Sequence, residues 1–180
     1  IFEAIKDVDF CIIISVLEAY TPDKKTLRVN KEKLGRYVFT NSLMRFGLHV
    51  AEIRTQTPDI IPEVSLDWPD RSCSQPFDVE YAAAYNSGTT HDKTVSYHCG
   101  PLNQLGFRDH ISYANMHHST LLQLSDLVVG ATRELIECSL GKKQPGQGID
   151  CLSRAAHRLR GYPDNILGWG INTYGDSGFR

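Results

Sequence analysis

The most regular alternation of hydrophobic and polar positions in the chain runs from Ser119 to Glu137. Apolar residues recur there at spacings of three and four, which places them on one side of a helix. They form one line and a second line beside it: Leu121, Leu124, Val128, Ala131 and Leu135, then Leu122, Val129 and Ile136. Because the two lines together cover a broad part of the circumference, we expect most of this helix to be buried.

Both ends of this stretch carry residues typical of helix termini. Thr120 and Gln123 have the spacing of a capping box, in which two side chains satisfy the unpaired N–H groups of the first turn. Gly141 is the usual residue just beyond a helix, and Lys142 and Lys143 suit the negative end of the helix dipole. The pattern therefore predicts a helix that begins at Thr120 and stops before Gly141.

The rest of the chain alternates between strand-type and helix-type patterns. Asn30 is a suitable cap for the first long helix, and Thr57-Pro58 stops it. Pro76 suits the first position of the next helix. The predicted elements are strand 9–17, helix 31–56, strand 63–67, helix 77–85, strands 94–98 and 110–113, the helix above, helix 149–160 and a weak strand 171–174. This order indicates an α/β fold whose sheet is at least partly parallel.

Composition narrows the class of protein. A chain of 180 residues with 41% hydrophobic and 22% charged residues is typical of one globular domain with a real core. The formal net charge of −2 gives no overall basic bias towards nucleic acid. The five cysteines form no C-x-x-C pair, and Cys11 and Cys138 lie in apolar patterns as buried thiols do, which favours the cytoplasm. The longest apolar run, residues 11–17, is too short to span a membrane.

Asp126 is the exception to the apolar pattern of the 120–140 helix. It lies about two turns in, opposite the main apolar line, and Gly130 leaves open space one turn further on. One interpretation is an ordinary solvent-facing aspartate, since charged residues usually occupy exposed faces. The other interpretation is a carboxylate that faces a functional cleft near the positive end of the helix.

The segment Leu121-Leu-Gln-Leu-Ser-Asp-Leu-Val-Val-Gly-Ala131 resembles the C-terminal motif of the DUF3800 family. As in that family, a short extended piece and a serine precede it, here residues 111–119. The resemblance covers residues 1–141 and implies a ribonuclease H-like mixed sheet flanked by helices, with a metal-dependent carboxylate site that includes Asp126. Beyond it, the sequence predicts a C-terminal helix and Gly-rich tail, residues 142–180, packed on that core.

One expected motif of the family does not occur at the start of this chain. The family's N-terminal strand carries an Asp-Glu-Ser-Gly motif, and nothing ahead of Asp9 matches it. We therefore expect the N-terminal strands of the fold, and further acidic residues, to come from an upstream segment that activity requires. The Tyr174-Gly-Asp-Ser-Gly178 segment is only a faint echo of the motif, at the other end of the chain.

Asp67 is the second candidate for a metal site. It ends the predicted strand 63–67, and open α/β sheets place their sites at the carboxyl ends of strands. The resembling family has an acidic residue at the corresponding strand end, although Trp68 stands where a second acid is common. Carboxylate oxygens suit Mg²⁺ or Mn²⁺, so Asp67 and Asp126 are the predicted catalytic and metal residues. The alternative for Asp67 is a turn residue before Trp68 and Pro69.

Four basic or neutral nitrogen side chains are weaker candidates for contacts with nucleic acid. His117 and His118 precede the long helix, where an imidazole can bind metal or relay a proton. Arg154 and Arg158 lie on the predicted helix 149–160 and can contact phosphates. The simpler interpretation is a polar loop pair for the histidines and a solvated helix face for the arginines.

These observations predict a nuclease that hydrolyses phosphodiester bonds of nucleic acid with Mg²⁺ or Mn²⁺, and a defence effector is one role that this chemistry suits. The alternative is a degenerate ribonuclease H-like module that binds a partner protein or nucleic acid without catalysis. A serine hydrolase is disfavoured because Ser125 lacks the Gly-x-Ser-x-Gly turn, and no Gly-rich phosphate loop precedes a helix. The sequence is compatible with a homo-oligomer, and no membrane association is expected.

Overall fold

A computed structural model of the chain describes residues 9–17, 24–67 and 76–174. It is a mixed α/β structure, as the sequence predicts. The contacts divide it into a first unit, Ile1–Ile14 with Asn115–Asn172, and a second unit, Ser15–Ala114 with Thr173–Arg180. The division of the sequence into 1–141 and 142–180 stays a prediction. Residues 1–8 and 68–75, the latter including Trp68, lie outside the described residues.

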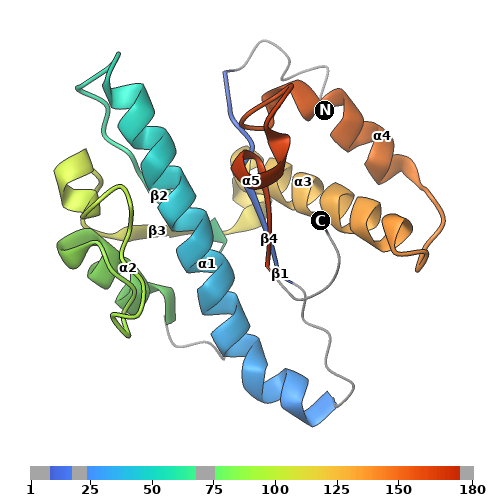
Figure 1. Cartoon of the computed structure of the whole chain (residues 1–180), viewed down its shortest axis with the longest axis horizontal. Helices are drawn as coiled ribbons and strands as arrows, with labels where there is room; N and C mark the ends of the chain where they lie inside the picture. Colours follow the sequence, from blue (N-terminus) through green and yellow to red (C-terminus); the bar gives the residue numbers. More distant parts are fainter. Residues whose placement is uncertain (1–8, 18–23, 68–75, 175–180) are drawn as a thin grey trace. The chain divides into compact units, whose positions relative to one another are not determined.

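The second unit is built around the long helix α1 (Lys24–Arg54), which lies beside β2 (Val64–Asp67), β3 (Ile111–Ala114) and α2 (Pro76–Ser87) (Figure 1). The 3-10 helix η2 (Leu102–Leu105) completes its core. Phe39, Leu43 and Val50 recur at spacings of four and seven on α1 and are buried. The core cluster also includes Val64, Tyr81, Ala84, Tyr97, Leu102, Phe107 and Ile111. Each fully buried apolar side chain of this size contributes about 1.5–3 kcal/mol to folding.

β2 and β3 form a two-stranded parallel sheet, which confirms the parallel pairing expected from the sequence. Val64 pairs with Ile111 and Leu66 with Tyr113, and these side chains belong to or pack against the core. Because side chains alternate along a strand, Ser65 and Asp67 point to the opposite face, where both are exposed. One face of this small sheet is therefore apolar and covered, and the other is polar.

In the second unit, one helix start and one strand differ from the sequence prediction. The first helix starts at Lys24, so Asn30 lies inside α1 and does not cap it. The predicted strand 94–98 is wrong: the chain there forms a tight loop with one isolated antiparallel bridge. Asp92 holds this loop, because its Oδ1 accepts hydrogen bonds from the Thr90 and Thr94 hydroxyls at 2.6 and 2.7 Å. Such local side-chain bonds compete with strand formation.

In the first unit, α3 (Thr120–Ser139) packs on α4 (Gln147–Arg154), as Figure 1 shows. The start of α4 is attached to α3 through Glu134, whose Oε1 accepts a hydrogen bond from the Gly146 amide at 2.8 Å. Lys143 Nζ lies 3.5 Å from the other oxygen of Glu134. The predicted helix 149–160 is instead α4 followed by the short 3-10 helix η4 (Ala156–Arg158).

The ends of α3 are partly as predicted. Ser119, not Thr120, is the N-cap, and its hydroxyl accepts the Leu122 amide at 3.3 Å. Gln123 does not close a capping box, because its side chain donates to the carbonyl of Met116 at 3.1 Å. Gly141 has a left-handed φ of 68° directly after the helix, which confirms the predicted stop.

The expectation that most of α3 is buried is wrong. Val128, Ala131 and Thr132 are buried, but Leu121 and Val129 are 72% and 60% exposed. Among the described residues, α4 makes the main helix contact with α3 and covers one side of it. Apolar spacing in the sequence marks positions that favour burial, but it does not guarantee that a neighbouring element covers each of them.

β1 (Ile14–Leu17) and β4 (Ile171–Tyr174) form a second two-stranded sheet. The predicted strand 9–17 is therefore regular only in its second half, although Ile12 makes an isolated parallel bridge with Leu159. Cys11 is exposed, so its expected burial is wrong. Within the described residues, none of the helices combines the length and the apolar character that a membrane crossing requires.

Candidate functional site

Asp67 is the last residue of β2 and is exposed at the carboxyl end of the parallel pair. Its partner in the register is Ala114, the last residue of β3. A strand end of this kind lies where the sites of α/β sheets are usually found, because loops and helix starts converge there. The structure thus confirms the position of Asp67 in the fold, and its metal role stays a prediction.

The polar face of the sheet carries a second carboxylate, Glu63, just before β2. Its Oε1 accepts the Ser112 hydroxyl at 2.5 Å, and its Oε2 lies 3.3 Å from Nε of Arg108. The hydrogen bond from Ser112 is the main reason that the pKa of Glu63 lies below its usual value. Glu63 is therefore engaged with a hydroxyl and a cation.

A further acidic residue, Asp78, was missed by the sequence analysis. The Tyr113 hydroxyl donates to Asp78 Oδ1 at 2.6 Å, which links β3 to the first turn of α2. Burial and the neighbouring carboxylate raise the pKa of Tyr113 well above its usual value. Tyr113 thus connects β3 and α2. The sequence signal for Asp78 was its place two residues after Pro76, where a helix dipole favours an acid.

Asp126 is exposed on the outer face of α3, away from the buried Val128 and Ala131. A Cβ built on Gly130 would meet no atom within 4 Å, so the space beside Asp126 is open, as predicted. Glu137 lies three turns further along the same face and forms an ion pair with Arg133 at 2.8 Å. The exposure of Asp126 therefore fits both a metal ligand and an ordinary surface aspartate.

Asp67 belongs to the second unit and Asp126 to the first. Across residues 9–17, 24–67 and 76–174, no three His, Cys, Asp or Glu side chains gather as a group that could hold a metal ion. The two aspartates thus stay a predicted pair, to be joined by ligands from elsewhere.

The two histidines lie in the 3-10 helix η3 (Met116–His118), directly before α3, and both are exposed. Asn115 begins this turn, because its Oδ1 accepts the His117 amide at 2.9 Å. The structure therefore places both imidazoles at the solvent-exposed start of the helix that carries Asp126. Their contact with metal or nucleic acid stays a prediction.

The two predicted arginines have different surroundings. Arg154 ends α4 and is exposed. Arg158 Nη1 lies 3.5 Å from Asp9, and its guanidinium lies 5.0 Å from the ring centroid of Phe10. Because these contacts hold Arg158 against its own chain, Arg154 is the more accessible of the two for a phosphate.

A scan against protein-family models and searches of curated proteins and of solved structures found no match to this chain. An exposed carboxylate at a strand end and an exposed carboxylate on a helix can each supply one oxygen ligand to a hard divalent cation.

Proposed function

We propose that this chain is the ribonuclease H-like part of a metal-dependent nuclease that hydrolyses phosphodiester bonds in nucleic acid in the cytoplasm. Asp67 and Asp126 each donate a carboxylate oxygen to Mg²⁺ or Mn²⁺. The observation that carries the proposal is the exposed Asp67 at the carboxyl end of the parallel β2–β3 pair. The resemblance of residues 121–131 to the DUF3800 motif adds Asp126.

The chemistry required of the two residues is limited and specific. A divalent cation lowers the pKa of a bound water and stabilises charge on the scissile phosphate, and the aspartates hold it in place. Both side chains must therefore be accessible, as they are. Because two aspartates are too few for a complete site, we expect an upstream segment of the same protein to supply the remaining acids. A role in defence is one biological use of this chemistry.

The second candidate function is a non-catalytic module that binds nucleic acid or a partner protein. It is favoured by the fact that the described residues contain no three-ligand group. It also fits Trp68, which stands where the resembling family commonly has an acid. The two candidates differ in whether the chain binds a divalent cation through its aspartates.

Calorimetric titration of the 180-residue chain with Mn²⁺ tests the proposal. Asp126→Asn should weaken Mn²⁺ binding by at least about tenfold, because it removes a charged ligand from the ion. Glu137→Gln is the matched control, since it removes the same charge from a half-exposed carboxylate on the same face of α3 and should leave the affinity unchanged.

Asp67→Asn should reproduce the effect of Asp126→Asn. Asp59→Asn, which changes an exposed aspartate in the turn between α1 and β2, should not. Equal Mn²⁺ affinity in the parent chain and both aspartate variants would contradict the metal role. If such a chain still binds a labelled oligonucleotide, the second candidate replaces the first.

A further inference from the structure

The segment from Gly161 to Gly170, which we call the Trp169 loop, is a tightly closed turn in the first unit. The Asn165 amide donates to the Gly161 carbonyl at 2.7 Å, and the Gly170 amide donates to the Ile166 carbonyl at 2.8 Å. Gly161 has a φ of 83°, and a Cβ there would come within 2.4 Å of the Asn165 carbonyl oxygen. The backbone of the loop is thus fixed by its own contacts.

The ends of the loop are attached to the N-terminal strand segment of the same unit. The amide of Arg160 donates to the Ile12 carbonyl at 3.0 Å, and the amide of Ile14 donates to the Gly170 carbonyl at 2.7 Å. These two hydrogen bonds lie at the two ends of the loop, so they fix its backbone to residues 12–14. A surface built in this way loses little conformational entropy when it binds a ligand.

The loop exposes three large apolar side chains, although its backbone is ordered by these bonds. Tyr162, Leu167 and Trp169 are 52%, 77% and 49% exposed. The three residues lie within eight positions of one loop, and such a group of exposed apolar side chains, here called the patch, is typical of an interaction site.

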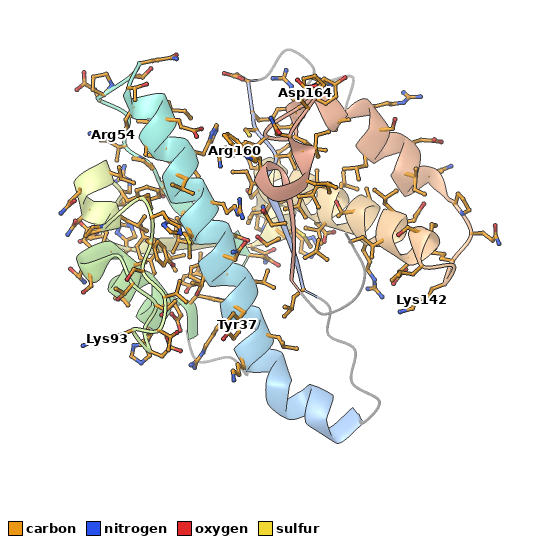
Figure 2. The ribbon with its side chains drawn as sticks, viewed as in Figure 1. Tyr37, Arg54, Lys93, Lys142, Arg160 and Asp164 are labelled. Atoms are coloured by element: carbon orange, nitrogen blue, oxygen red, sulfur yellow. The ribbon has the colours of Figure 1, made fainter. Side chains whose placement is uncertain are left out.

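The chemistry around Trp169 indicates the kind of ligand. The guanidinium of Arg160 lies 5.0 Å from the Trp169 ring centroid, a cation–π contact that fixes the indole and leaves about half of the residue exposed. Arg154 is exposed shortly before the loop, and Asp164 is the acid within it (Arg160 and Asp164 are labelled in Figure 2). An exposed aromatic ring in contact with one arginine, with a second exposed arginine in the same unit, suits a planar base on a negatively charged backbone.

We propose that the Trp169 loop is a stacking platform for single-stranded nucleic acid, with one base against Trp169 and the adjacent phosphates attracted by Arg154 and Arg160. The proposal rests on the proposed function for its substrate class and names where that substrate is held. It assigns no metal and no chemical step to the loop. Stacking uses the face of a base, so the platform is tolerant of base sequence and requires an unpaired strand.

Tryptophan fluorescence can report this contact directly, because the chain has two tryptophans, Trp68 and Trp169. In a Trp68→Phe background, Trp169 is the sole emitter. Titration with a twelve-residue oligothymidylate, at low salt and with EDTA, should quench its emission saturably. The same sequence in a duplex should quench much less, because its bases are already stacked. No quenching by the single strand, or equal quenching by the duplex, would overturn the proposal.

Variants then measure the contribution of the ring. Trp169→Ala should raise the Kd for the labelled single strand by about 5- to 150-fold, as expected for loss of one stacked base. Trp169→Phe keeps an aromatic face and should recover part of the affinity. Tyr37→Ala removes a 56% exposed aromatic residue from α1 of the other unit and should leave Kd unchanged.

Leu167→Ala separates base stacking from general apolar docking. Leu167 is the most exposed side chain of the patch, so a protein partner or a second copy of the chain would use it. We expect its truncation to change the Kd for the oligonucleotide less than twofold. A loss equal to that of Trp169→Ala would overturn the stacking proposal.

This experiment and the Mn²⁺ titration fail independently. EDTA removes divalent cations, so oligonucleotide binding at Trp169 does not depend on the two aspartates. Conversely, Trp169→Ala should leave Mn²⁺ affinity unchanged. Stacking without metal binding would refute the nuclease and keep the platform. Metal binding with an unchanged Kd in Trp169→Ala would refute only the platform.

Discussion

Gly88, which directly follows α2, is the position in the second unit where replacement by alanine should have the clearest structural effect. Its φ of 64° lies in the left-handed region, and its carbonyl accepts the Tyr97 amide at 2.7 Å. A Cβ at this position would lie 2.6 Å from the backbone nitrogen of Pro101 and 2.7 Å from the carbonyl carbon of Gly100. Since these atoms belong to the backbone, the neighbour cannot move aside as a flexible side chain would.

Two contributions add in Gly88→Ala. A left-handed conformation costs about 1–2 kcal/mol for a residue with a Cβ. Steric overpacking in a well-packed region costs about 1–3 kcal/mol more. We therefore expect the free energy of unfolding to fall by about 2–5 kcal/mol, which is a large part of the stability of a typical domain.

Two other glycines of the same unit serve as controls that separate the contributions. Gly100 has a φ of 75°, but its Cβ would meet only a Gln104 side-chain oxygen, at 3.8 Å. Gly100→Ala should therefore cost only the conformational part, about 1–2 kcal/mol. A Cβ on Gly35, inside α1, would meet nothing within 4 Å, so Gly35→Ala should stabilise the chain by up to about 1 kcal/mol.

Urea unfolding followed by circular dichroism measures all three changes. The expected order of stability is Gly35→Ala, then the parent chain, then Gly100→Ala, with Gly88→Ala the least stable. If Gly88→Ala were as stable as Gly100→Ala within error, the close approach of the Gly100–Pro101 backbone to the end of α2 would be refuted. If Gly100→Ala had no cost, the left-handed turn would be refuted as well.

Three further predictions concern titratable and hydrogen-bonded groups. Burial raises the pKa of Tyr81 to about 12, so its contribution to stability is present below pH 10 and is lost as the pH rises to 12. The parent chain should lose about 2–3 kcal/mol of its free energy of unfolding between pH 10 and pH 12, and Tyr81→Phe should not show this loss. The same alkaline profile in both proteins would refute this. Hydrogen bonds from Thr90 and Thr94 lower the pKa of Asp92 to about 2, so stability should fall from pH 4 to pH 2. Asp92→Asn should flatten that fall, measured by urea unfolding at each pH. Glu134→Ala should speed hydrogen exchange at the Gly146 amide, which donates to Glu134 in the parent chain. Equal exchange rates in the two proteins would show that this hydrogen bond does not anchor α4.

The sequence predicted those elements whose residues favour one conformation on both local and tertiary grounds. The α3 helix and its stop at Gly141 were predicted because apolar spacing and terminal residues agreed. The segment 94–98 was not, because its alternating pattern could not reveal that the Asp92 carboxylate would bond to the loop around it. Similarly, nothing local in residues 24–30 marks the earlier start of α1.

The candidate site was predictable only where a residue's position in an element determines its surroundings. Asp67 was expected at a strand end, and it lies there. The contact between Tyr113 and Asp78 joins residues 35 positions apart, so only the folded chain reveals it. The role of Arg160 beside Trp169 was equally hidden, because the sequence analysis weighed Arg154 and Arg158 as one helix face and the chain there turns into the loop.

The central claim is that Asp67 and Asp126 hold the same divalent cation, and a double-mutant cycle of Mn²⁺ affinity tests it most directly. Isothermal titration would compare the parent chain with Asp67→Asn, Asp126→Asn and the double variant. If both carboxylates bind one ion, each single variant loses most of the affinity and the double variant loses little more, giving strong non-additivity. Independent, additive losses would show two separate weak sites, and no loss at all would show that neither aspartate binds metal.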